Sequence, residues 1–230
     1  MIRLFLRCTS GNKELLAVSD GFRESTQSWK EVLLSLRAHG LTHAPSLVVC
    51  DGAMGFQAAM AEVWPTTRIQ RCWFHKSGNV LDKLPGSLQE KAKGMLHDQY
   101  LAPTKEEALK AFGLFVETCG AKYPKAVACL VNDKDDLSAF YDFPAAQWMH
   151  LRTTNPIESI FATVLLRHRT AKGNGTRKAT LAMVYKLCKE AEKSWRKLQG
   201  FKLIPLVEAE RPGSAGRKFK DGELVDEAIA

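Results

Sequence analysis

The sequence predicts an α/β fold that is interrupted by a helical insertion, and three observations lead to this prediction. Strand-like and helix-like segments alternate over residues 2–74. Residues 89–148 show helical spacing and no convincing strand. The apolar run Leu47–Cys50 has no alternation, which is typical of a strand buried on both faces, and it ends in Asp51-Gly52. Open α/β sheets bind ligands at this end of their strands.

The first part of the chain, residues 1–85, is expected to have the order β-β-α-β-α-β. Turn residues between the first two strands predict a hairpin, Gly40 ends the first helix, and Pro65 stops the second. The strands are expected over 2–7, 14–19, 47–50 and 68–74, and the helices over 25–39 and 56–63.

Residues 86–150 are expected to form the helical insertion, with helices over 91–101, 105–118 and 124–130. Residues 151–205 follow, with one helix from Pro156 to about Arg167 and a long basic helix over 178–198. Residues 206–230 are charged and lack periodicity, so we expect a tail there.

Composition is that of a globular protein with one sizeable core, because 45% of the 230 residues are hydrophobic and 25% are charged. No apolar run is long enough to span a membrane, and Met1–Leu6 is too short for a signal peptide. We therefore expect a cytoplasmic protein whose six scattered cysteines are reduced thiols.

The net charge of +8 is concentrated in one segment. Residues 1–150 carry 17 Lys and Arg against 16 Asp and Glu, whereas residues 151–205 carry 12 against 3. A local basic segment indicates a polyanionic partner, although a solvated basic surface explains the same charge pattern.

Two carboxylates are candidates for chemistry. Asp51 follows a strand, where it is either a turn residue or a ligand. Glu158 lies three residues after Asn155, so it either completes a capping box or joins Asp51 in binding Mg²⁺. Two such ions can activate a water for phosphodiester cleavage, and Asp20 is the candidate for a third carboxylate, although a turn aspartate explains it as well.

Cys72 and His75 form a Cys-x-x-His pattern, which is half of a zinc site. No second Cys and His lie at ligand spacing, so a packed strand end or a phosphate contact explains the pattern as well.

The segment 167–178 packs five cations and two glycines into twelve residues. Glycines let the backbone approach phosphate and the cations neutralise it. A solvated loop between helices explains the same pattern, but beside a carboxylate site we expect nucleic-acid contacts from this segment and from the start of the Glu158 motif. The residues expected to make them are Arg152, Arg167, Arg169, Lys172, Arg177 and Lys178.

Several motifs in one order make the chain resemble the mutator-type transposases of bacterial insertion sequences, from about Gly11 to Phe201. The matching stretches are Asp20-Gly21-Phe22-Arg23-Glu24-Ser25, Ser28-Trp29, Val49-Cys50-Asp51-Gly52, Gln70-Arg71-Cys72-Trp73-Phe74-His75-Lys76, Asn79, Lys122-Tyr123-Pro124, Phe140-Tyr141-Asp142-Phe143-Pro144, Arg152-Thr153-Thr154-Asn155-Pro156-Ile157-Glu158-Ser159 and Trp195.

This resemblance implies a ribonuclease-H-like core over residues 1–85 and 151–205. It also implies an Asp-Asp-Glu triad that uses Mg²⁺ to cleave and join DNA at transposon ends. By motif match, Asp51 resembles the second acid and Glu158 the third, 107 residues apart. Cys72 and His75 match the family's Cys-x-x-His signature, whose role is structural or in DNA positioning.

The family's first aspartate lies on a strand before the opening hairpin, and neither that strand nor the N-terminal DNA-binding region is in this sequence. We therefore expect the C-terminal part of a transposase, N-terminally truncated in its core. The alternative is a catalytically inactive remnant that only binds DNA or full-length transposase. The expected partners are DNA and a second transposase chain, in the bacterial cytoplasm at the nucleoid.

Overall fold

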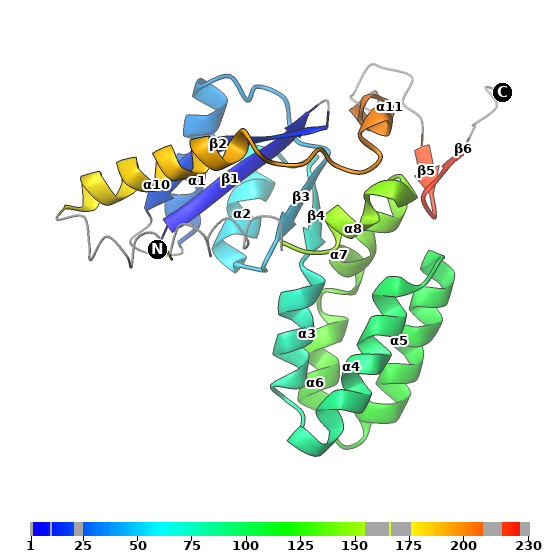
Figure 1. Cartoon of the computed structure of the whole chain (residues 1–230). Helices are drawn as coiled ribbons and strands as arrows, with labels where there is room; N and C mark the ends of the chain where they lie inside the picture. Colours follow the sequence, from blue (N-terminus) through cyan, green and yellow to red (C-terminus); the bar gives the residue numbers. More distant parts are fainter. Residues whose placement is uncertain are drawn as a thin grey trace. The chain divides into compact units, whose positions relative to one another are not determined.

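The computed structural model describes residues 2–9, 11–20, 25–154, 166, 176–208 and 218–225. The fold is mixed α/β and mostly helical, and its described strands form three two-stranded sheets (Figure 1). Contacts divide the chain into two compact units. The first comprises residues 1–46, 52–67 and 154–205, and the second comprises residues 47–51, 68–153 and 206–230.

The first unit opens with the predicted hairpin. Strand β1 (Ile2–Thr9) pairs antiparallel with β2 (Asn12–Asp20), and a shift in register falls between Phe5 and Leu6. Gly11 supports the turn because its φ of 85° lies in the left-handed region, which side chains disfavour. Helix α10 (Arg177–Glu192) runs along β2 and buries Val184 and Cys188 (Figure 1).

Two further helices described in this unit pack against each other. The Ser25 side chain caps α1 (Thr26–Ala38) by accepting from the amide of Ser28 at 3.3 Å. The α1 residue Trp29 meets Phe56 of α2 (Met54–Val63) edge to face, with ring centroids 5.0 Å apart. Both helices lie where the sequence predicted them.

The second unit contains the predicted strand of residues 47–50 as β3 (Leu47–Cys50), which pairs in parallel with β4 (Arg68–Arg71). The expectation that β3 is buried on both faces was wrong. Only Cys50 is buried, and the other three residues are half-buried. Within the described residues β4 is the only strand paired with β3, so an unbroken apolar run overstated its burial.

Strand β4 is shorter than predicted, because residues 73–81 form a helix, α3 (Trp73–Leu81), that the sequence analysis missed. After Cys72 the ladder ends, and the amide of Trp73 donates to the carbonyl of Arg152 at 2.9 Å. Trp73 and Val80 are buried at helical spacing. The consecutive aromatic residues 73–74 had looked like a continuing strand, yet Phe74 is 61% exposed.

The predicted helices of residues 86–150 are present as α4 (Gly86–Leu101), α5 (Lys105–Gly120) and α6 (Pro124–Val131), which lie beside α3 in a bundle (Figure 1). Thr104 caps α5, and Pro124 occupies the first turn of α6. The core is apolar and includes Leu96, Phe115 and Leu130, all fully buried. Four short helical segments follow, α7 (Lys134–Ser138), η1 (Ala139–Asp142), η2 (Ala145–Gln147) and α8 (Trp148–Leu151).

The segment expected as a tail contains ordered elements. Residues 206–208 of this segment complete α11 (Ile204–Glu208), which follows η3 (Phe201–Leu203), and a hairpin joins β5 (Lys218–Lys220) to β6 (Glu223–Val225). Phe219 is buried against Phe143. The Asp221 carboxylate accepts from the amide of Lys105 at 2.6 Å. These contacts join residues far apart in sequence, which periodicity cannot reveal.

Candidate active site

Asp51 lies where the sequence predicted, at the carboxyl end of a parallel strand pair. The register pairs Cys50 with Arg71, and Asp51 is the first residue beyond β3. Its side chain is exposed. Gly52 follows with φ at 92°, in the left-handed region, so the chain turns sharply after the carboxylate. An exposed carboxylate at a strand end is accessible to a hydrated cation and to a phosphate ligand.

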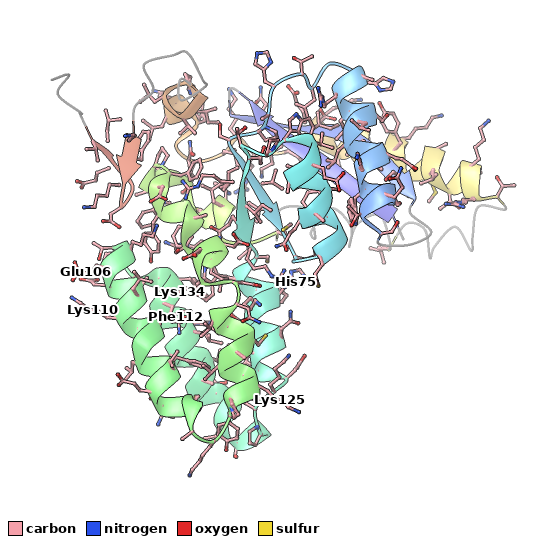
Figure 2. All side chains as sticks on the ribbon, turned by 180° about the vertical axis from the view of Figure 1, so that it is seen from behind. His75, Glu106, Lys110, Phe112, Lys125 and Lys134 are labelled. Atoms are coloured by element: carbon pink, nitrogen blue, oxygen red, sulfur yellow. The ribbon has the colours of Figure 1, made fainter. Side chains whose placement is uncertain are left out.

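The Cys72–His75 pair lies at the same end of the strand pair. The amide of Cys72 donates to the carbonyl of Cys50 at 2.8 Å, so Cys72 lies beside the residue that precedes Asp51. The ring Nδ1 of His75 lies 3.3 Å from the Cys72 sulfur, and Cys72 is fully buried. Figure 2 labels His75 on α3, far along that helix bundle from Lys125. Over the described ranges, no cluster of three His, Cys, Asp or Glu side chains could hold a metal.

Glu158 lies outside the described residues. The structure does describe Arg152, which begins the motif that contains Glu158. The carbonyl of Arg152, six residues earlier, accepts from the amide of Trp73. Trp73 directly follows Cys72, whose own amide bonds to β3. The segment that leads to Glu158 therefore begins beside the strand end that carries Asp51.

The Arg152 side chain packs against aromatic rings of its own unit. Its guanidinium carbon lies 4.9 Å from the ring centroid of Phe140 and 5.4 Å from that of Trp148. Burial lowers the pKa of Arg152, against the opposing effect of Tyr141 and Tyr100. The Nε atom is buried and makes no hydrogen bond to any described residue. This packing anchors the segment, and DNA contact by Arg152 stays a prediction.

The other predicted DNA contacts are only partly described. Arg167, Arg169 and Lys172 lie outside the described residues. Arg177 and Lys178 are exposed in the first turn of α10, which Thr176 caps by accepting from the amide of Ala179 at 3.2 Å. Exposed residues continue along the same helix at Tyr185, Lys186 and Lys189.

The sequence analysis missed a buried charge cluster beside the candidate site. Arg71 and Lys76 flank the Cys72–His75 pair and both contact Asp133, which lies between α6 and α7. The buried residues Cys72 and Trp73 lie between the two cations in sequence, and this apolar neighbourhood is a local sign that both cations are buried. Nothing in the sequence pointed to the carboxylate, because it lies 57 residues after Lys76.

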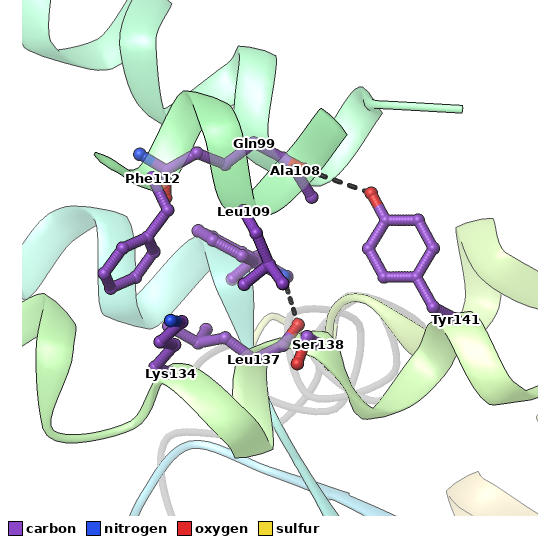
Figure 3. Close-up of a pocket in the computed structure, with 9 residues that line it drawn as sticks. Gln99, Ala108, Leu109, Phe112, Lys134, Leu137, Ser138 and Tyr141 are labelled. Atoms are coloured by element: carbon purple, nitrogen blue, oxygen red, sulfur yellow. Dashed lines mark hydrogen bonds between the residues drawn. The ribbon is translucent and has the colours of Figure 1, made fainter. Parts of the chain in front are cut away.

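The helix bundle contains a small pocket between α3, α4, α5 and α7, with a volume of about 10 Å³ (Figure 3). Trp73 lines it and donates from its indole nitrogen to the carbonyl of Leu137 at 2.8 Å. Opposite, the Tyr141 hydroxyl lies 3.2 Å from the carbonyl of Gln99 and 2.9 Å from that of Ala102, and burial raises the pKa of Tyr141 to about 12. The pocket is too small for a substrate.

Membrane-spanning helices are not found among the described residues, since no helix there is both long and apolar enough.

Comparison with known proteins places the chain in a family. Residues 8–198 match the family model described as "Transposase, Mutator family". The chain is 47% identical over 216 residues to the transposase for insertion sequence element IS6120 of Mycolicibacterium smegmatis, covering 94% of this chain and 65% of that protein. It is 51% identical over 215 residues to the transposase for insertion sequence element IST2 of Acidithiobacillus ferrooxidans, covering 92% of this chain and 70% of that protein.

A more distant relative is the transposase for insertion sequence element ISRM5 of Rhizobium meliloti, 27% identical over 185 residues, or 80% of this chain and 46% of that protein. The chain thus spans about two thirds of its nearer relatives' length and half of this one's. Because the family model covers most of the sequence, the chain belongs to the Mutator family of transposases.

Proposed function

We propose that this chain carries the catalytic part of an insertion-sequence transposase that cleaves and joins DNA strands at transposon ends with Mg²⁺. In this proposal Asp51 and Glu158 are catalytic carboxylates and metal ligands in a ribonuclease-H-like core. The chain acts with a second transposase chain, on DNA at the nucleoid. The observation that supports the proposal best is the backbone hydrogen bond from the amide of Trp73 to the carbonyl of Arg152. It holds Arg152, the first residue of the Glu158 motif, near the end of the strand that precedes Asp51.

The chemistry of Asp51 fits Mg²⁺, which prefers hard oxygen ligands and completes its shell with waters and phosphate oxygens. Asp51 offers an exposed carboxylate at a strand end, and Glu158 is the second ligand we propose. Held by Asp51 and Glu158, two such ions would activate the attacking water and stabilise the leaving oxygen. The role of the chain's own residues is to hold both carboxylates and to bind the DNA backbone.

DNA backbone binding is assigned to the basic segment 151–205, with Arg177 and Lys178 at the start of α10 as described members. Arg152, Arg167, Arg169 and Lys172 complete the proposed contact set. Cys72 and His75 are assigned a structural or DNA-positioning role, since they contact each other where β4 ends.

The test measures DNA binding and Mg²⁺-dependent strand cleavage by the whole chain, on duplexes that carry the transposon ends. We expect binding that weakens steeply with salt. Because the family's first aspartate is not in this sequence, we expect only weak cleavage, which Asp51→Asn and Glu158→Gln should each abolish. Asp98→Asn is the control, because Asp98 is exposed on α4. Salt-sensitive binding without any cleavage would support the inactive DNA-binding alternative. No binding even at low salt would exclude both functions.

A further inference from the structure

Two buried cations flank the Cys72–His75 pair. Arg71 ends β4 and Lys76 lies in the first turns of α3, and each is only 5% exposed. A buried charge is costly unless an opposite charge and hydrogen bonds compensate for the missing water. No Asp or Glu lies in the sequence between Glu62 and Asp82, so the compensating carboxylate has to come from elsewhere in the fold.

Asp133 supplies that carboxylate. One of its oxygens, Oδ2, accepts from Nε of Arg71 at 2.9 Å and also contacts Nζ of Lys76. Lys76 Nζ donates in addition to the carbonyl of Cys129 at 2.8 Å. The Nη1 atom of Arg71 is buried and has no hydrogen-bond partner in the described part of the chain, so this guanidinium depends on Asp133. One carboxylate at the start of α7 thus holds both β4 and α3.

The cluster is connected to the strand that carries Asp51 by backbone hydrogen bonds. Arg71 is the register partner of Cys50, which directly precedes Asp51. The next residue, Cys72, donates its amide to the carbonyl of Cys50. A displacement of Arg71 therefore reaches the backbone of Asp51 through one strand pair.

We propose that Asp133 is a positioning residue of the candidate active site. By holding Arg71 and Lys76 together, it fixes the end of β4 and, through it, the backbone that presents Asp51. The effect of Asp133 on catalysis rests on the proposed function, whereas its effect on the structure at the end of β4 does not.

The test is hydrogen–deuterium exchange on the whole chain without metal, read at the amides of Cys72 and Trp73. Replacing Asp133 by Asn leaves two buried cations without a counter-charge, so we expect both amides to exchange about tenfold faster. Asp135→Asn is the matched control because Asp135 is exposed on the same helix, and it should change neither amide. Unchanged exchange in Asp133→Asn, or an equal rise in the control, would overturn the proposal.

Two further variants keep the test decisive if Asp133→Asn does not fold. Asp133→Glu keeps the charge, and we expect it to hold exchange within about threefold of wild type. Arg71→Met removes the link to β4 but leaves Lys76 with its carboxylate, so exchange at Cys72 and Trp73 should rise as in Asp133→Asn. Retained protection in Arg71→Met would overturn the proposal.

A second measurement separates positioning from general stability. Mg²⁺ alone is titrated while exchange is followed over residues 47–53. In wild type we expect Mg²⁺ to slow exchange there, and Asp133→Asn to raise the half-effective concentration about tenfold, with rescue by Asp133→Glu. An unchanged half-effective concentration in Asp133→Asn would overturn the catalytic part of the proposal. No effect of Mg²⁺ on wild type would count against the proposed function, and the metal-free comparison still decides the role of Asp133.

Discussion

Two buried glutamines, one on β4 and one on α4, differ in whether their side-chain amides are hydrogen-bonded. Gln70 is fully buried, and its amide donates to the carbonyls of Arg71 and Leu137 and accepts from the amide of Phe140. Gln99 is 1% exposed, and neither its amide nitrogen nor its amide oxygen makes a hydrogen bond within the described ranges.

The difference shows which interactions determine the structure at the end of β4 and in the helix bundle around Gln99. Around the end of β4, the amide of Gln70 and the Nε atom of Arg71 have specific partners in Asp133, α7 and η1, so the geometry there is specified by hydrogen bonds. In the bundle around Gln99 the fold depends on apolar packing, and the buried side-chain amide of Gln99 lowers the stability of the folded state. A site that positions a carboxylate needs the first kind of construction.

The largest expected effect is the removal of the Gln70 network. Gln70→Leu would leave the buried amide of Phe140 without its acceptor and would remove one of the two donors to the Leu137 carbonyl, so we expect the free energy of unfolding to fall by about 3 kcal/mol. Denaturant unfolding followed by circular dichroism measures it. Gln27→Leu is the control, because Gln27 is exposed on α1 and should cost under about 0.5 kcal/mol. A decrease no greater than the control's would mean that the network does not specify this region.

The next largest effect on stability is expected at Gly222, which we compare with Gly94 of the same compact unit. Gly222 in the β5–β6 turn has φ at 81°, and an added Cβ would lie 2.5 Å from Cβ of Ala145 and 2.8 Å from its backbone. We therefore expect Gly222→Ala to destabilise the protein by about 2–3 kcal/mol.

Gly94→Ala is its counterpart within α4. No described atom lies within 4 Å of an added Cβ there, so helix propensity should stabilise the protein by about 0.5–1 kcal/mol. Thermal unfolding of both variants checks the pair. A tolerated Gly222→Ala would show that the C-terminal hairpin is not held against η2 in solution.

A smaller effect of opposite sign is expected at Gln99. Gln99→Leu removes an amide that has no described partner from beside the apolar pocket of Figure 3, so we expect the unfolding free energy to rise by about 1 kcal/mol. The same unfolding assay measures it. A decrease in stability would show that this amide is hydrogen-bonded in solution, and would remove the contrast with Gln70.

The sequence analysis succeeded where the signal is local and failed where it depends on distant partners. Helical spacing predicted the three helices found within residues 86–131, and the apolar run ending at Asp51 predicted β3 and the position of the carboxylate at its end. The helix starting at Trp73 was missed because its first amide is bonded to Arg152, 79 residues away.

The C-terminal hairpin and the Asp133 cluster were missed for the same reason. Asp221 bonds to Lys105 across 116 residues, and Asp133 compensates cations that precede it by more than 50 residues. No window of sequence contains both members of such a pair, so only the folded chain reveals them.

The smallest expected effect on stability belongs to the exposed lysines of α10, which complete the contrast between buried and exposed charge. Lys178, Lys186 and Lys189 lie on the exposed side of the helix, and the described partner of Lys189 is Glu192, at 2.6 Å. Replacing all three by Gln removes two solvated charges and one ion pair within the helix, so the free energy of unfolding should change by no more than about 0.5 kcal/mol. DNA binding should nevertheless weaken, and the slope of log affinity against log salt should flatten by about 0.9 for each phosphate that the variant no longer binds.

The matched control removes the same charge from the helical insertion, at Lys91, Lys93 and Lys125, which are exposed on α4 and α6, with Lys125 labelled in Figure 2. We expect this control to keep the wild-type salt slope, because net charge alone contributes little once the phosphate-binding side chains are intact. Equal flattening in both triple variants would mean that binding follows total charge and that α10 is not a DNA-contacting surface. A flattened slope confined to the α10 variant, at unchanged stability, would show that this helix contacts DNA through charges the fold does not need.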